Sequence, residues 1–193
     1  MPAQTTAEAP VAAAIANRFS LGVGSGVNSF GGNMGKLYST SSPVVEARGE
    51  WAFSPIISAR GGVDFVKYSF NASPNGAVNV STNSIQAAAQ CHYLSTAMSG
   101  SGFDPYVSAG AAQVFRTQTF LDHNAAEKDN AFALSAGIGT NYLPAGARVG
   151  FWAEADAGKI FFADRFTSSY LASGIEDLTG TMYSARLGMK YVF

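Results

Sequence analysis

The sequence predicts an all-β fold, an eight-stranded antiparallel up-and-down transmembrane β-barrel, and three observations support this prediction. Only 13 % of the 193 residues are charged, about half of the roughly 25 % usual in a soluble domain. Hydrophobic residues reach 47 %, yet no run approaches the 18 or so consecutive apolar residues of a membrane-spanning helix. From Phe19 onward the apolar residues instead recur at every second position, as in a strand with one apolar face.

The chain divides into a short leading segment and the barrel. Residues 1–17 are rich in alanine and contain no Lys or Arg, which first appear at Arg18. A secretory signal needs a basic region and an unbroken apolar core, and both are missing here. We therefore expect a flexible N-terminal segment over residues 1–17 and a barrel over residues 18–193.

The first four strands are expected at residues 19–27, 44–54, 57–65 and 85–93. Strand one alternates Phe19, Leu21 and Val23 with serine and glycine. Polar or turn-forming composition predicts a loop at residues 28–43, a tight turn at Ser54-Pro55 and a loop at residues 71–79. A turn rich in glycine and serine follows strand four.

The last four strands are expected at residues 106–116, 132–142, 147–156 and 183–193. They are separated by a charged loop at residues 119–130, a tight turn at residues 143–146 and a long loop at residues 161–178. Long and short connections thus alternate, as in bacterial outer-membrane barrels, whose periplasmic turns are short and whose outer loops are longer. An even number of strands also returns both termini to the periplasmic side.

The charged residues of these strands share the face opposite to the apolar one. A Lys or Arg facing lipid at the bilayer midplane costs about 2–4 kcal/mol, so this face is expected to line the lumen. The lumen of an eight-stranded barrel is just wide enough for side chains to fill it. We therefore expect five acids and five bases to pair there and block the lumen: Glu46, Arg48, Glu50, Arg60, Asp64, Arg148, Glu154, Asp156, Arg186 and Lys190.

A soluble barrel with an apolar ligand cavity, as in lipocalins, is the alternative fold, and it would put these charges outside. The aromatic residues favour a membrane, because they gather near the expected strand ends, as in the girdles of membrane barrels. The expected periplasmic belt comprises Phe19, Trp51, Phe53, Tyr93, Phe103, Tyr142, Tyr191 and Phe193. The expected outer belt comprises Tyr68, Phe70, Phe115, Phe120, Phe132, Phe161 and Phe162.

The final strand, 183–193, reads YSARLGMKYVF and resembles the closing strand of OmpA-like and opacity-type outer-membrane barrels. Residues 103–112, FDPYVSAGAA, resemble the start of the fifth strand in the same families. The resemblance covers residues 19–193 and implies a barrel domain only, without a peptidoglycan-binding domain. It also implies that Tyr191 and Phe193 form an assembly signal read by the barrel-assembly machinery.

The function expected from these features is non-enzymatic. We expect an integral outer-membrane protein with a filled lumen that contributes to envelope structure and presents four surface loops for interaction. A narrow channel for small solutes is one alternative. A hydrolase at the outer rim is another, with Asp122, His123, Ser168 and Ser169 as its candidate residues.

The expected partners are outer-membrane lipids and lipopolysaccharide, the barrel-assembly machinery during biogenesis and an unidentified partner of the surface loops. A net charge of −1 gives no basic surface for nucleic acid. A single cysteine, Cys91, allows no internal disulfide and no cysteine-based metal cluster, and its position on the apolar face predicts contact with lipid. No cofactor or metal site is expected, and the protein is expected to be a monomer.

Overall fold

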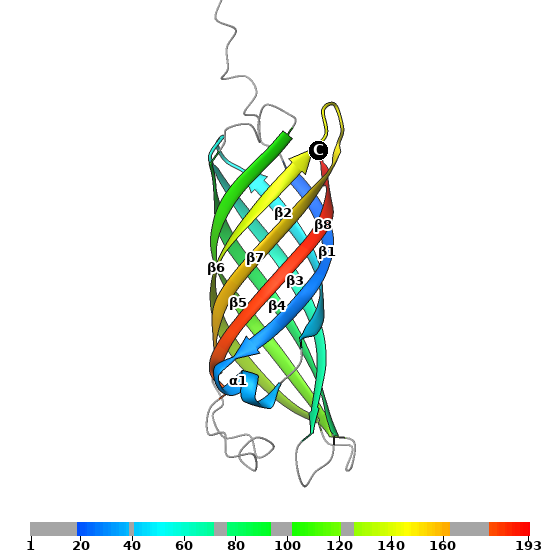
Figure 1. Cartoon of the computed structure of the whole chain (residues 1–193), viewed down its shortest axis with the longest axis vertical. Helices are drawn as coiled ribbons and strands as arrows, with labels where there is room; N and C mark the ends of the chain where they lie inside the picture. The colour runs from blue at the N-terminus through cyan, green and yellow to red at the C-terminus, as the bar shows by residue number, and fades with distance from the viewer. Residues whose placement is uncertain (1–18, 39–40, 72–76, 94–101, 121–125, 163–177) are drawn as a thin grey trace, which may run out of the picture.

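The computed structural model describes residues 19–38, 41–71, 77–93, 102–120, 126–162 and 178–193. Eight antiparallel strands form a closed barrel, each pairing with its sequence neighbours, and β1 pairs with β8 to complete the circle (Figure 1). The strands are β1 (Phe19–Gly31), β2 (Ser42–Ala52), β3 (Ile57–Asn71), β4 (Ala77–His92), β5 (Gly102–Phe120), β6 (Ala126–Leu143), β7 (Val149–Phe162) and β8 (Gly180–Val192). The predicted fold class is confirmed.

The two ends of the barrel differ. The turns between β2 and β3 and between β6 and β7 lie at the end that carries Phe193, which we call the Phe193 end (Figure 1). Ser54 Oγ tightens the first turn by accepting a hydrogen bond from the Ile57 amide at 3.0 Å. In the second turn the Ala147 amide donates to the Pro144 carbonyl at 3.0 Å, and Gly146 supplies the positive φ of 72°.

The opposite end, which we call the α1 end, carries a short helix that the sequence analysis did not predict. Helix α1 (Gly32–Leu37) directly follows β1 inside the segment expected to be a loop (Figure 1). Gly32, with a φ of 66°, turns the chain out of the strand. Met34 is buried at 1 % exposure, so the helix places an apolar side chain over the barrel mouth. Within the described ranges no helix is long and apolar enough to span a membrane.

Strands β3 to β6 are 15 to 19 residues long, against 11 to 14 residues for the other four. About 9–11 tilted residues suffice to cross a bilayer, so these strands extend past the membrane at the α1 end. The predicted loops at 71–79 and 119–130 are correspondingly too long, because strand pairing continues to Asn71↔Ala77 and Thr119↔Ala126. The turn-forming residues in these two segments suggested loops, but the hydrogen-bonded pairing of the strands continues into both segments.

The exterior of the barrel is apolar over its middle. Leu21, Val45, Ile85, Ile138 and Leu187 are each at least half exposed. A contiguous apolar surface of this extent would make a soluble protein aggregate, whereas lipid acyl chains cover it at no cost. With charged side chains inside and apolar ones outside, the soluble-barrel alternative is wrong.

Aromatic residues mark both edges of the apolar band. All eight residues of the expected belt at the Phe193 end are exposed, and Phe193 stacks on Phe19 with ring centroids 5.6 Å apart. At the other edge only Phe115, Phe132 and Phe161 are exposed as expected. Three residues assigned to that outer belt point into the barrel instead, because they have the inward parity of their strands: Tyr68, Phe70 and Phe162. The side chain of Phe120 lies outside the described residues.

The charged interior of the barrel

The interior nearer the Phe193 end is organised around Glu154 of β7. Its carboxylate contacts the guanidinium groups of Arg48 (3.2 Å) and Arg60, one from each of β2 and β3. It also accepts hydrogen bonds from Tyr106 Oη at 2.9 Å and Ser108 Oγ at 3.1 Å, both on β5. Glu154, Arg48 and Arg60 are each at least 95 % buried. One carboxylate thus joins four strands across the lumen.

The guanidinium of Arg48 also lies over an aromatic ring. Its Cζ is 3.4 Å from the ring centroid of Trp152, a buried residue two positions before Glu154. Room for the indole comes from two glycines that face each other on β1 and β8, Gly24 and Gly188. A Cβ on Gly24 would approach Trp152 Cζ2 to 2.3 Å, so no larger residue fits there without movement.

Nearer still to the Phe193 end, Glu50 connects two bases. It pairs with Lys190 Nζ at 2.6 Å and with Arg48 at 2.8 Å, and it accepts a hydrogen bond from Ser20 Oγ at 3.4 Å. Together with the Glu154 group these contacts form one continuous network, in which every charged residue has a partner of the opposite sign.

A second group, nearer the middle of the barrel, is built on Arg186 of β8. Three carboxylates surround its guanidinium: Glu46 at 3.1 Å, Asp64 at 3.3 Å and Asp156 at 3.9 Å. The amide of Gln86 on β4 donates to Glu46 and Asp64 at 3.3 and 3.1 Å. The carboxylates in this group therefore outnumber the bases.

The structure brings together nine of the ten residues expected in the lumen and leaves out Arg148. Arg148 lies in the turn before β7, fully exposed, where its guanidinium donates to Tyr191 Oη at 3.3 Å. This hydrogen bond raises the pKa of Arg148 above its ordinary value. Arg148 has the inward parity of β7, but β7 begins only at Val149. Arg148 therefore lies before the strand, and its side chain does not enter the lumen.

Near the Phe193 end, a further polar group contains a residue that the sequence analysis had not singled out. His92 Nδ1 lies 2.7 Å from Asp104, and His92 Nε2 lies 2.8 Å from Ser58 Oγ. Asn141 donates to the same Asp104 carboxylate at 3.2 Å. His92 has the same inward parity as Gln90 on β4. Asp104 lies next to a proline at a strand start, so its inward position was not evident.

At the α1 end the interior is apolar, which sequence analysis missed entirely. We call this cluster the apolar plug; its buried members are Met34, Tyr38, Phe70, Val78, Val80, Val114, Ala131, Ala133, Ile160, Phe162 and Leu178. They come from α1, from the segments flanking the barrel mouth and from β3 to β7. The apolar plug residues on the strands have the same inward parity as the charged residues nearer the Phe193 end. That parity was the sequence signal that could have predicted the apolar plug.

One ion pair is enclosed by the apolar plug. Arg116 of β5 pairs with Asp129 of β6, donates to Tyr38 Oη at 2.9 Å and lies 4.9 Å from the ring centroid of Phe162. Burial raises the pKa of Tyr38 well above its ordinary value, so the phenol stays neutral while its oxygen accepts this hydrogen bond. Asp129 was expected in a loop, and the extension of β6 places it inside.

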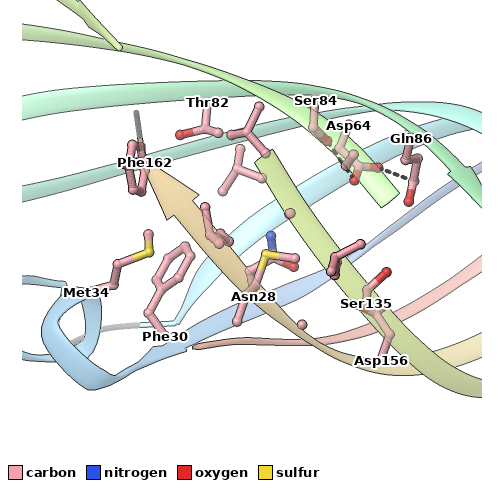
Figure 2. Close-up of a pocket in the computed structure, with 18 of the residues that line it drawn as sticks. Asn28, Phe30, Met34, Asp64, Thr82, Ser84, Gln86, Ser135, Asp156 and Phe162 are labelled. Atoms are coloured by element: carbon pink, nitrogen blue, oxygen red, sulfur yellow. Dashed lines mark hydrogen bonds between the residues drawn. The ribbon is translucent and has the colours of Figure 1, made fainter. Parts of the chain in front are cut away.

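A cavity of about 50 Å³ separates the Arg186 group from the apolar plug (Figure 2). Its polar wall includes Asn28, Asp64, Ser135 and Asp156, and the opposite wall carries plug residues such as Met34. With charged groups on one side and the plug on the other, the described interior is filled along most of its length.

The candidate catalytic residues of the outer rim are not among the residues that the structure describes. Asp122, His123, Ser168 and Ser169 lie outside the described residues. In the described ranges, no group of three or more His, Cys, Asp or Glu side chains is arranged to hold a metal ion. Cys91 is exposed on the exterior, as expected.

An apolar exterior, aromatic edges and a lumen filled by paired charges define an integral membrane protein of the eight-stranded β-barrel class. No protein-family model and no curated protein matches the sequence. Among solved structures the chain is similar to Neisserial surface protein A, with a TM-score of 0.59, 13 % identity and coverage of 92 % of this chain and 97 % of that one.

Two other solved barrels are similar over the same region. The N-terminal β-barrel domain of Pseudomonas aeruginosa OprF has a TM-score of 0.53 and 15 % identity, covering 90 % of this chain and 97 % of that one. Ail, the attachment invasion locus protein of Yersinia pestis, has a TM-score of 0.51 and 14 % identity, covering 92 % and 97 %. All three are eight-stranded outer-membrane barrels, so the resemblance noted in the sequence extends to the fold.

Proposed function

We propose that this chain is an integral, non-catalytic protein of a bacterial outer membrane that contributes to envelope structure and presents its α1 end for interaction at the cell surface. The observation that supports this most directly is the pairing of an apolar exterior with an interior filled by Glu154, its two arginines and the apolar plug. Such a body is a rigid membrane anchor for whatever its loops contact.

The same filled interior argues against a channel, and planar bilayers test this directly. We expect the folded protein to show no discrete single-channel conductance over a range of voltages. Reproducible conductance steps would show that the Glu154 network opens. They would contradict the proposed structural role and favour a channel for small solutes.

The proposed orientation places the α1 end outside the cell and both termini in the periplasm, because short turns characterise the periplasmic side of such barrels. In a Cys91→Ala background, Lys36→Cys on α1 should react with a membrane-impermeant maleimide on intact cells. Arg148→Cys, which is exposed in a turn at the other end, is the matched control and should react only after permeabilisation. Labelling in the reverse order would contradict the orientation.

Outer-leaflet lipids, lipopolysaccharide included, are proposed partners of the exterior near the α1 end. Among the described side chains every exposed charged residue is basic, and three of them lie on the outward face of strands: Lys67, Lys128 and Lys159. Lys67, Ser81, Thr117 and Lys128 form one row of register partners across β3 to β6. Amines at the edge of an aromatic girdle can pair with lipid phosphates.

Replacing these three lysines by Gln tests the lipid proposal. The triple variant should retain less lipopolysaccharide than wild type after purification in mild detergent. Arg148→Gln, which removes an exposed base at the opposite end, should retain the wild-type amount. Equal retention by both variants would contradict the proposed contact.

Tyr191 and Phe193 are proposed to act as the signal for the barrel-assembly machinery. Both side chains face outward, at 39 % and 64 % exposure, and their rings pack on each other at 5.1 Å. Phe193→Ala should slow assembly by the reconstituted machinery while leaving spontaneous folding in detergent unchanged. Phe53→Ala removes an equally exposed ring at the same end and should affect neither rate. The folded protein is proposed to be a monomer.

A further inference from the structure

The cavity between the apolar plug and the Arg186 group adjoins charges that do not balance. Around Arg186 lie the three carboxylates of Glu46, Asp64 and Asp156. If all are ionised, this group carries two excess negative charges. A carboxylate held out of water without compensation is strongly unfavourable, so this layer requires positive charge from elsewhere.

The neighbouring network supplies only part of it. The Glu154 layer holds Arg48, Arg60 and Lys190 against Glu154 and Glu50, an excess of one positive charge. One negative charge therefore remains over the two layers together. Arg148, which would have balanced it, lies outside the barrel in solvent. The imbalance follows from the position of a single turn.

A second observation points into the same cavity. Asn28 of β1 is 98 % buried and lines the cavity, and its side-chain oxygen Oδ1 has no hydrogen-bond partner (Figure 2). A buried carbonyl oxygen without a donor costs about 1–3 kcal/mol. Ser135 and Asp156 line the same cavity as Asn28, so an amide, a hydroxyl and a carboxylate border one space (Figure 2).

The chemistry of these groups restricts what could occupy the space. The side chains of Asn28, Ser135 and Asp156 each carry an oxygen that can accept a hydrogen bond or bind a cation. Within the described part of the chain no group of three or more carboxylates is arranged to hold a metal ion. Ca²⁺ takes six to eight oxygen ligands, and Mg²⁺ requires a near-ideal octahedral set that usually includes several waters beside one or two carboxylates, which is more than this space holds. A volume of about 50 Å³ admits only a few water-sized particles.

We propose that this cavity binds one small monovalent cation, such as Na⁺ or K⁺ with part of its hydration shell, between Asp156, Asp64 and Asn28. The cation supplies the positive charge that the lumen lacks and satisfies the Asn28 oxygen. It links the charged interior to the base of the apolar plug. Its role is structural, because plug and network close the cavity on both sides.

Anomalous diffraction from crystals of the detergent-folded protein in rubidium chloride tests the site directly. A rubidium peak in the cavity, within coordination distance of Asn28 and Asp156, is expected. Crystals at saturating rubidium with no peak there would overturn the proposal.

Unfolding measurements test the energetic consequence. At equal ionic strength, sodium should stabilise the wild-type protein relative to N-methyl-D-glucamine, which is too large to enter. The unfolding equilibrium constant should fall about tenfold at a sodium concentration about ten times the Kd. Stability that responds to pH but to no monovalent cation would show that a proton on a carboxylate supplies the charge, and would overturn the proposal.

Two variants and one control locate the effect. Asp156→Asn removes the excess charge and Asn28→Ala removes the free oxygen, so both should lose most of the sodium dependence, each judged against its own stability without sodium. Ser108→Ala lies in the other layer, leaves the charge of the lumen unchanged and should keep the wild-type dependence even if it lowers stability. Loss of the dependence in all three variants, or in none, would contradict a site in this cavity.

Discussion

The two halves of the barrel interior are filled by side chains of different chemistry. Towards the Phe193 end, Glu154 and its neighbours fill the lumen with ion pairs and hydrogen bonds. Towards the α1 end, Met34, Val78 and Phe162 fill it with apolar contacts like those of a soluble core. Strands β3 to β6 extend beyond the membrane at this second end, where water surrounds the wall and apolar burial is again favourable. The two halves should therefore respond oppositely to loss of charge.

The largest effect is expected from Glu154→Gln. It leaves Arg48 and Arg60 buried without their shared carboxylate, which typically costs about 3–5 kcal/mol. Urea unfolding of the protein folded into lipid vesicles measures it. Ser108→Ala removes one neutral hydrogen bond to the same carboxylate and should cost only about 1 kcal/mol. Equal losses would mean that the ion pairs contribute no more than the hydroxyl.

A somewhat smaller loss is expected when the apolar plug is opened. Met34→Ala removes a side chain that is 1 % exposed, and buried Met→Ala replacements cost about 2–5 kcal/mol. We expect a value at the lower end, because α1 lies at the mouth and can settle into the space. The same unfolding assay measures the loss, and an unchanged midpoint would show that α1 does not contribute to the folded barrel.

The ion pair inside the plug should behave unlike the pairs below it. Replacing Arg116 by Met and Asp129 by Leu together should leave stability unchanged or raise it by about 1–4 kcal/mol, because an apolar surrounding favours apolar replacements. Asp129→Asn alone should destabilise, since it leaves Arg116 buried without its carboxylate. A large loss in the double variant would show that the plug depends on this pair for its geometry.

No measurable change in the unfolding midpoint is expected from Arg148→Gln. Arg148 is fully exposed, and its hydrogen bond to Tyr191 lies in water at the Phe193 end. Arg148 and Glu154 have the same parity along the sequence, but only Glu154 lies in the lumen. Comparing the two variants therefore tests whether location in the lumen, and not parity alone, determines the loss of stability. A loss comparable to that of Glu154→Gln would place Arg148 inside the lumen after all.

Much of the candidate site could be predicted from parity alone. Glu46, Arg60 and Arg186 were assigned to the lumen because charge at alternate strand positions cannot face lipid. Which residues pair with which could not be predicted, since Arg60 of β3 meets Glu154 of β7 across the barrel. The Arg116–Asp129 pair was missed because Asp129 was expected in a loop, and the length of β6 depends on its partner strands.

By itself, the sequence determined the strand count, the antiparallel order and which face meets lipid, because the period of two and the cost of charge in a bilayer act locally at each residue. The tertiary structure decided where the strands end, and with them the position of Arg148 outside, Asp129 inside and α1 over the mouth. Those positions depend on the hydrogen-bonded register of all eight strands around the closed barrel, so they cannot be predicted from the sequence of any single strand. The filled interior, its apolar plug and the residual negative charge beside the cavity are consequences of that closure.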